Sequence, residues 1–90
     1  MLETERQDTD FEALRQIVSA VLKIPVDQIK AEARLSDLAL VESIKLLRIA
    51  GKIERRFGIE IEDEVLFREA SLREVTEEIV NLRRVQSAAA

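Results

Sequence analysis

One serine, Ser43, is placed where a side-chain hydroxyl could take part in chemistry. It lies in the run Leu40-Val41-Glu42-Ser43-Ile44, where an irregular stretch gives way to a helical pattern. The first turn of a helix has N–H groups without partners inside the helix, and the helix dipole adds positive potential there. A phosphate joined to the Ser43 oxygen would gain from both effects, so the serine is a candidate attachment point. A serine that begins a helix can equally be an N-cap, which needs no ligand.

The composition of the chain leaves few other groups for catalysis. The sequence has no cysteine and no histidine, which removes thiolate chemistry, the usual general base and the usual metal ligand. We therefore predict no catalytic residue, no metal site and no enzyme activity for the chain alone. Its 90 residues support one small domain. No stretch has the pattern of a membrane span or a signal peptide, so the expected location is the cytoplasm.

The pattern of apolar residues predicts an all-α domain. Glycine, proline and aromatic residues are rare, which favours packed helices over a sheet with many turns. Apolar residues recur every three or four positions in several stretches. We expect three longer helices and one short helix, at about 10–22, 43–57, 63–67 and 72–84. A long loop without regular structure is expected between the first two, and loops of that length are often functional.

Short sequence signals mark where these helices begin and end. Thr9 with Glu12, and Ser71 with Glu74, have the spacing of a capping box. In this motif a hydroxyl and a carboxylate each accept a hydrogen bond from the other residue's backbone N–H. Gly58 is placed for the left-handed residue that commonly follows a helix, here the second one.

The folded domain is expected to span 9–85, between flexible tails at 1–8 and 86–90. One apolar face of each longer helix should form its core. The expected core residues are Phe11, Leu14, Ile17, Val18, Leu46, Ile49, Ile53, Phe57, Val75 and Ile79.

The order of these elements and three short sequences resemble the acyl carrier proteins. The sequences are Leu35-Ser36-Asp37-Leu38 before the serine, Glu42-Ser43-Ile44 at it, and Phe57-Gly58-Ile59-Glu60-Ile61 after the second helix. The resemblance covers about 11–84 and implies a four-helix acyl-carrier-like bundle. It also implies that Ser43 is esterified by 4'-phosphopantetheine from coenzyme A, whose thiol holds an acyl or aminoacyl group as a thioester.

Such a carrier moves an intermediate between biosynthetic enzymes and is not an enzyme. The resemblance implies three kinds of partner: a phosphopantetheinyl transferase, an acyl- or aminoacyl-loading ligase, and a downstream transferase or synthase. It also implies a monomer. The attached arm brings the thiol, which reconciles a thioester with a chain that has no cysteine.

The residues around the serine differ from those common in fatty-acid carriers. Glu42 stands where aspartate is usual, Ile44 stands where leucine is usual, and one more residue separates Leu38 from the serine. The resulting Leu-Val-Glu-Ser run is more similar to stand-alone D-alanyl and other aminoacyl carriers. We therefore expect a role outside housekeeping fatty-acid synthesis.

The second helix is basic, although the chain has a net charge of −4. Within 43–57, five cationic side chains stand against one carboxylate, a net charge of +4. A partner enzyme should therefore present acidic or apolar groups to this helix. The cations could instead be a solvated helix face, and the apolar residues near the serine could belong to the core. The resemblance places partner docking at Ile44, Lys45, Leu47, Arg48 and Gly51.

The alternative function is a small helical interaction module that is never modified and binds a partner through the basic second helix. Nucleic acid is a weaker variant of this alternative, because the acidic net charge and the rarity of aromatic residues argue against it. We predict no nucleic-acid partner. Attachment of phosphopantetheine distinguishes the carrier from the module.

Overall fold

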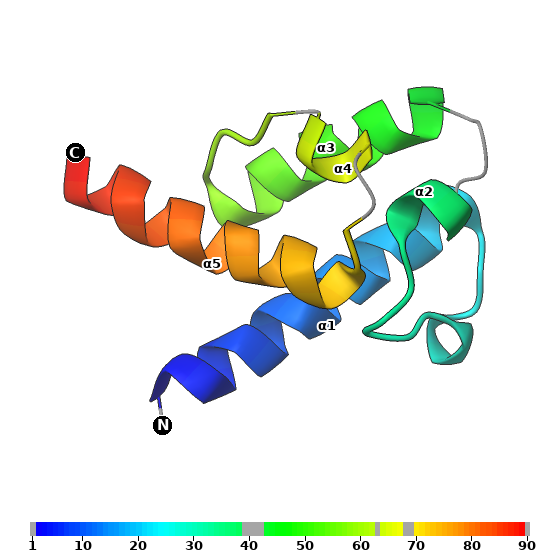
Figure 1. The fold of residues 1–90 in the computed structure, drawn as a ribbon, viewed down its shortest axis with the longest axis horizontal. Coiled ribbons are helices and arrows are strands. Elements are labelled where there is room, and N and C mark those ends of the chain that lie inside the picture. The colour runs from blue at the N-terminus through cyan, green and yellow to red at the C-terminus, as the bar shows by residue number, and fades with distance from the viewer. Residues whose placement is uncertain (1, 39–42, 63, 68–69, 90) are drawn as a thin grey trace.

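The computed structural model describes residues 2–38, 43–62, 64–67 and 70–89 (Figure 1). This part of the chain is helical and contains no strand beyond an isolated bridge between Arg34 and Ser71. The elements are α1 (Leu2–Leu22), η1 (Val26–Gln28), α2 (Leu35–Leu38), α3 (Ser43–Phe57), α4 (Glu64–Phe67) and α5 (Leu72–Ala89). The predicted all-α bundle, with three longer helices and a short one before the last, is confirmed.

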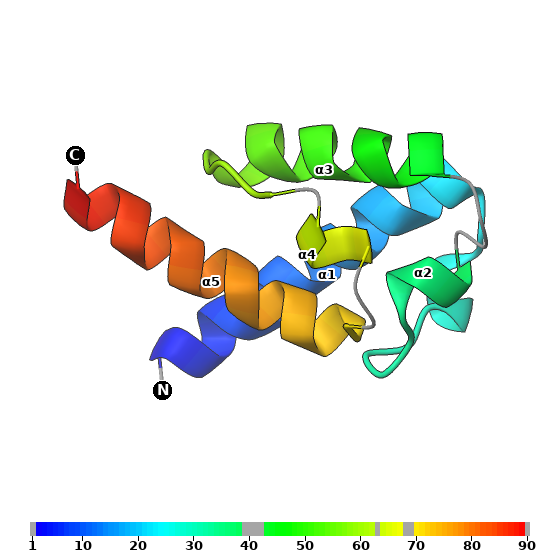
Figure 2. The same ribbon diagram turned by 45° about the horizontal axis from the view of Figure 1, so that its top comes forward.

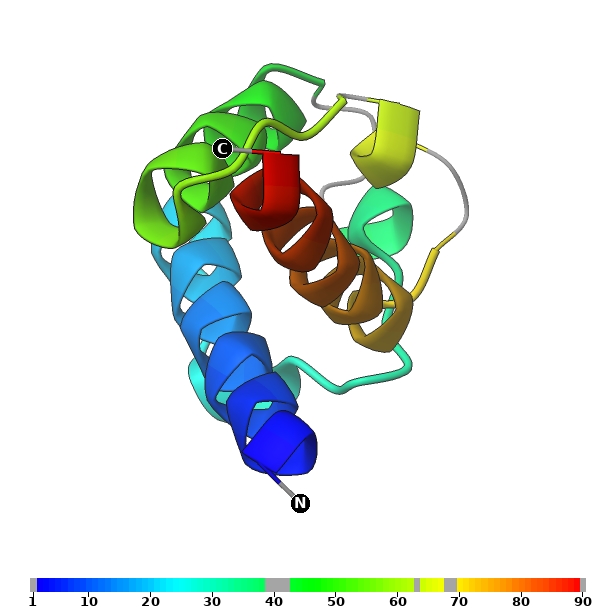
Figure 3. The ribbon, with the colours of Figure 1, turned by 90° about the vertical axis from the view of Figure 1, so that its left-hand side faces the viewer.

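The three long helices surround one core. α1 packs against both α5 and α3, and the short α4 packs against α3 and α2. Viewed from one end, α1, α3 and α5 lie around the centre of the molecule (Figure 3). α1 and α5 diverge toward the end of the molecule where the chain begins and ends, and α3 begins at the opposite end (Figures 1 and 2).

The predicted core is confirmed for eight of its ten residues, which are buried. The other two, Phe11 and Ile17, are partly buried and pack against the rest. The connecting segments add further apolar residues. Ile59 and Ile61 point inward on either side of the exposed Glu60, so the alternating pattern that resembles a strand belongs to an extended segment with one buried face.

The predicted start of the first long helix and the predicted end of the last long helix are both wrong. α1 begins at Leu2, so Thr9 lies inside the helix and does not cap it, and Glu12 forms an ion pair with Arg15 instead. α5 continues past 84 to Ala89. The two extensions consist mainly of Leu, Glu, Arg, Gln and Ala. These residue types favour a helix by their intrinsic propensity, even where the helix has no apolar face. The division into a domain of 9–85 and two flexible tails stays a prediction.

The inner helix ends follow the local signals. The Ser71 N–H donates to Glu74 Oε1 at 3.0 Å, and the Glu74 N–H donates to Ser71 Oγ at 3.2 Å, so this capping box is confirmed. Gly58 has a φ of 67° and follows α3. The N–H groups of Gly58 and Ile59 both donate to the Glu54 carbonyl, at 2.9 and 3.3 Å, which satisfies a carbonyl that the helix leaves open.

Candidate functional site

α3 begins at Ser43, as the sequence predicts. Figure 2 shows this helix along its length, with its first turn at the end of the molecule opposite the chain ends. The side chain of Ser43, and the whole of Glu42 before it, lie outside the residues that the structure describes. The site is therefore built here from the loop that leads to Ser43 and from the helix that follows it.

The loop between α1 and α3 is not without regular structure, which corrects the prediction. It contains the single turns η1 and α2, and it buries Ile29 and Leu35 in the core. A loop of this length can bury apolar side chains only if its backbone polar groups find partners. Those partners come from both α1 and α5.

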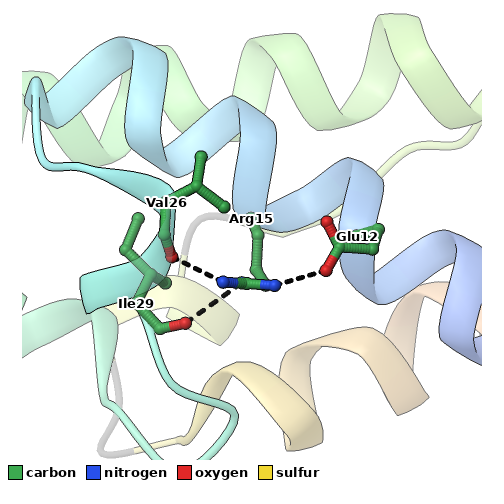
Figure 4. A network of polar contacts seen from close by, with 4 residues as sticks. All are labelled: Glu12, Arg15, Val26 and Ile29. Atoms are coloured by element: carbon green, nitrogen blue, oxygen red, sulfur yellow. Dashed lines mark hydrogen bonds and ion pairs between the residues drawn. The ribbon is translucent and has the colours of Figure 1, made fainter.

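Arg15 of α1 holds the first half of the loop (Figure 4). Its guanidinium donates to the Val26 carbonyl at 2.6 Å and to the Ile29 carbonyl at 3.0 Å, and it pairs with Glu12. Ser19 adds a third bond from α1, with its hydroxyl donating to the Ile24 carbonyl at 2.6 Å. These bonds fix η1 against α1.

The start of α5 holds the second half of the loop. The Leu72 N–H donates to the Ala33 carbonyl at 2.8 Å, and the Arg73 N–H donates to the Ala31 carbonyl at 2.9 Å. Arg73 also forms an ion pair with Glu32. The loop carbonyls thus satisfy N–H groups that the first turn of α5 would leave open. The same bonds fix the path of the chain just before α2.

The predicted docking residues lie on α3, and the structure gives the exposure of each. Ile44 is 68% exposed and Leu47 is 46% exposed, so the alternative that they belong to the core is wrong. Arg48 is exposed, whereas Lys45 and Gly51 are half-buried. Residues 44, 47, 48 and 51 follow the spacing of one helix face, and Lys45 lies beside it.

The positive charge of α3 is concentrated on its exposed side. Glu54, the one carboxylate in the helix sequence, accepts a hydrogen bond from the Ile61 N–H at 3.0 Å and is thereby held against the α3–α4 loop. Arg48, Lys52 and Arg55 are exposed, and the structure shows no ion pair for them within the chain it describes.

A pocket of about 460 Å³ lies between the α3–α4 connection, α4 and α5. Its apolar residues are Ile61, Val65 and Leu82, and four carboxylates and Gln86 complete its lining. Gln86 joins α5 to the connection, since it accepts from the Glu60 N–H and donates to the Glu60 carbonyl, each at 2.9 Å. The pocket begins beyond the last turn of α3 and does not include Ser43.

No cluster of three or more acidic, cysteine or histidine side chains in the described part of the chain could hold a metal ion. None of the helices there is long and apolar enough to cross a membrane.

Reasoning from the sequence missed the residues that hold the loop. Arg15 and Arg73 have only the ordinary appearance of helix-surface cations in the sequence. Their partners are mostly backbone carbonyls that lie far away along the chain, and a carbonyl has no sequence signature. The length of the loop was the one available signal that some anchor must exist.

The chain was compared with known proteins. Residues 12–79 match the family described as "Phosphopantetheine attachment site". A polyketide synthase, PksL of Bacillus subtilis (strain 168), is 33% identical over 70 residues, which is 78% of this chain and 2% of that protein. An acyl carrier protein of Campylobacter hominis is 27% identical over 74 residues, which is 82% of this chain and 94% of that protein.

The family match extends from α1 to α5 and includes the loop and α3. The two relatives differ greatly in size, since the chain spans a small part of one and nearly all of the other. Members of this family hold a covalent 4'-phosphopantetheine and do no catalysis of their own. The chain belongs to the phosphopantetheine attachment site family and is a carrier protein of the acyl carrier type.

Proposed function

We propose that the protein carries an acyl or aminoacyl intermediate as a thioester on 4'-phosphopantetheine attached to Ser43, and delivers it to biosynthetic enzymes. The observation that carries the proposal is the start of α3 at Ser43, inside the region that matches the attachment-site family. A phosphodiester there would gain about 0.3–1 kcal/mol from the helix N-terminus when exposed to water.

The other hydroxyls of the matched region are poorer candidates for attachment. The Ser19 hydroxyl donates to a backbone carbonyl, and the Ser71 hydroxyl caps α5. Thr76 is buried and its hydroxyl donates to the Leu72 carbonyl at 2.8 Å. Ser36 lies inside the single turn of α2 and does not begin a helix. Ser43 is the remaining serine of this region, and it opens one of the three long helices.

The residues of the chain would serve such an arm by positioning it. When bound, the arm supplies a thiol that forms the thioester. The bonds of Arg15 and of the first turn of α5 fix residues 26–33 of the loop between α1 and Ser43. The five residues Ile44, Lys45, Leu47, Arg48 and Gly51 would then meet the partner enzymes beside the attachment point.

The test is the intact mass of the protein after incubation with coenzyme A and a broad-specificity phosphopantetheinyl transferase. The wild type should gain one phosphopantetheine, and Ser43→Ala should gain none. Ser36→Ala is the matched control, because it removes another serine from the stretch between α1 and α3 and should be labelled like the wild type. Labelling of Ser43→Ala, or an unlabelled wild type, would contradict the assignment.

The class of cargo is a further part of the proposal. The Leu-Val-Glu-Ser run and the basic α3 support an aminoacyl or specialised acyl cargo over a housekeeping fatty acid. The loading ligase, the downstream transferase or synthase, the monomeric state and the cytoplasmic location all stay predictions. The alternative function is an unmodified interaction module. It would be favoured if the protein took up no phosphopantetheine but still bound a partner through α3.

A further inference from the structure

The pocket between α5 and the α3–α4 connection has no part in the proposed function. Its volume is about 460 Å³, which falls within the range typical of ligand pockets. We call it the α5 pocket. Its floor is apolar, because Ile61 and Val65 belong to the core and Leu82 packs half-buried against that core. The floor therefore favours an aliphatic group over water.

The walls of the α5 pocket are acidic on both sides. Glu60, Glu62 and Glu64 come from the connection and from α4, and all three are exposed. Glu78 comes from α5 and is half-buried. Within the described part of the chain, no lysine or arginine lines the pocket and none of the four carboxylates forms an ion pair. Like charges around one apolar floor repel one another, so a cation from outside would be attracted there.

The α5 pocket depends on a part of α5 that lies beyond the family match. That match ends at residue 79, whereas Leu82 supplies part of the floor and Gln86 part of the lining. The Gln86 side chain accepts from the Glu60 N–H and donates to the Glu60 carbonyl, which holds the two walls together. The residues that match the family are therefore not enough to build this pocket.

We propose that the α5 pocket docks a lysine or arginine side chain that a partner protein presents. The aliphatic stem would lie over the apolar floor, and the charged end would lie among the carboxylates of the walls. Charge complementarity carries the choice of a cation, and the floor carries the choice of a cation on an aliphatic stem. The proposal goes beyond the proposed function, because it needs neither Ser43 nor an arm attached to it.

A protein side chain suits the pocket better than a free metal ion or a free amine does. The carboxylates do not form a cluster that could hold a metal ion, since the described residues contain none. A free amine brings only its own charges, whereas a protein can present further cations to the exposed Glu60, Glu62 and Glu64. A folded partner also holds its side chain in place before binding, so less conformational freedom is lost.

The position of the pocket separates it from the attachment point. Along the axis of α3, Phe57 lies about 21 Å from Ser43, because an α-helix rises by about 1.5 Å per residue. The pocket wall begins at Glu60, just after that end of α3, where the connection leaves the helix (Figure 2). A protein docked at the α5 pocket would therefore leave the start of α3 open. Such a partner could hold the carrier while other enzymes use the arm.

The probe is a short synthetic peptide with one central arginine, lysines toward both ends and no acidic residue. Its binding to the full chain, with and without phosphopantetheine, is measured by calorimetry and by amide NMR shifts. We expect shifts at 60–62, 64–65 and 78–86, and an affinity that falls as salt is raised. A peptide with glutamates in place of all the cations should bind at least about tenfold more weakly.

Glu78 gives the sharpest test, because its neighbour Glu77 is a matched control. Glu78→Gln removes a charge from the α5 pocket and should weaken peptide binding about fivefold or more. Glu77→Gln removes the same charge from an exposed position that does not line the pocket, so it should weaken binding about twofold or less. Neither variant should lower the unfolding midpoint, because each removes one carboxylate from an acidic region. Equal losses of binding in the two variants would overturn the pocket, since they would show attraction to the general negative charge.

A double-mutant cycle then tests insertion of the side chain. Replacing the central arginine of the peptide by norleucine keeps an aliphatic stem and removes the charge. This change should weaken binding to the wild type about tenfold, and it should have little effect on binding to the Glu64→Gln, Glu78→Gln double variant. Equal losses on both proteins, no binding of the basic peptide, or NMR shifts confined to other parts of the chain would overturn the proposal.

Further arms test the other occupants and the separation from Ser43. Spermidine or calcium ion that binds at the same residues more tightly than the peptide would overturn the choice of a protein side chain. The transferase should label the peptide-bound chain at the rate of the free chain, and loss of labelling only in the presence of peptide would overturn the separation. A chain that is never labelled but binds the peptide would contradict the proposed function and support the α5 pocket.

Discussion

Arg15 shows how much one side chain contributes to the placement of the site. It is mostly buried and donates to two carbonyls of the loop that leads to Ser43, while Phe11 lies against its guanidinium with 5.6 Å between Cζ and the ring centroid. Hydrogen bonds from a charged donor are among the stronger ones in proteins. Ser19, nearer the end of α1, is another residue of this helix whose side chain donates to a loop carbonyl.

Arg15→Met keeps the aliphatic stem and removes the donors. The two loop carbonyls lose their partner, so the free energy of unfolding should fall by about 1.5–3 kcal/mol in urea denaturation. The rate of labelling by the transferase should fall as well, because η1 and the loop residues next to it are less well held against α1. Lys30→Met, at an exposed position of the same loop, should change neither quantity. Unchanged stability in Arg15→Met would show that water replaces the guanidinium without cost.

Lys23 is a second residue whose backbone gives a prediction. It follows α1 with a φ of 58°, which is unfavourable for a residue with a Cβ, and its N–H donates to the Ser19 carbonyl at 2.8 Å. Lys23→Gly should raise the free energy of unfolding by about 0.5–1 kcal/mol, because the folded backbone is then unstrained. Thermal and urea unfolding measure this. A loss of stability would mean that the extra freedom of glycine in the unfolded chain outweighs the relief.

At the scale of the elements, one contact joins all three long helices. Arg83 of α5 forms an ion pair with the buried Asp10 of α1 at 3.1 Å, and its Cζ lies 5.1 Å from the ring centroid of Phe57 at the end of α3. The contact lies toward the last turn of α3. It is therefore suited to hold the helices together without touching the segment that presents Ser43.

Arg83→Met should destabilise the bundle without impairing the site. Removal of the guanidinium leaves the Asp10 carboxylate buried without its partner, and we expect a loss of about 1–3 kcal/mol, reduced by the partial exposure of Arg83. The labelling rate at a temperature well below the unfolding midpoint should stay within about twofold. Asp10→Asn with Arg83→Met should recover part of the loss, since an amide is less costly to bury than a charge. A slower labelling rate in the folded variant would show that the contact also orders the loop.

At the scale of the whole molecule, the sequence predicted the features that depend on local signals. The start of α3 at Ser43, the cap at Gly58 and the capping box at Ser71 are each specified within a few residues. Helical periodicity identified most of the core. The prediction at Thr9 was wrong because its spacing to Glu12 shows only that a helix could begin there. The spacing does not show that the helix cannot extend further toward the N-terminus.

The features that the sequence did not predict depend on contacts between distant segments. The turns η1 and α2 exist because carbonyls near them are bound by α1 and α5, and those donors lie 11 or more residues away. The inward direction of Ile59 and Ile61 depends on the packing of the connection between α3 and α4 against the core.

The placement of the chain ends bears on how such a domain can be used. α1 begins and α5 ends at one pole of the bundle, whereas α3, whose first residue is Ser43, begins at the other (Figure 1). Polypeptide joined to either end would therefore leave from the far side and would not cross the path of an arm or of an enzyme approaching it. One architecture can thus make up nearly the whole of a small protein or a small part of a very long chain, the two settings in which the matched region occurs in its relatives.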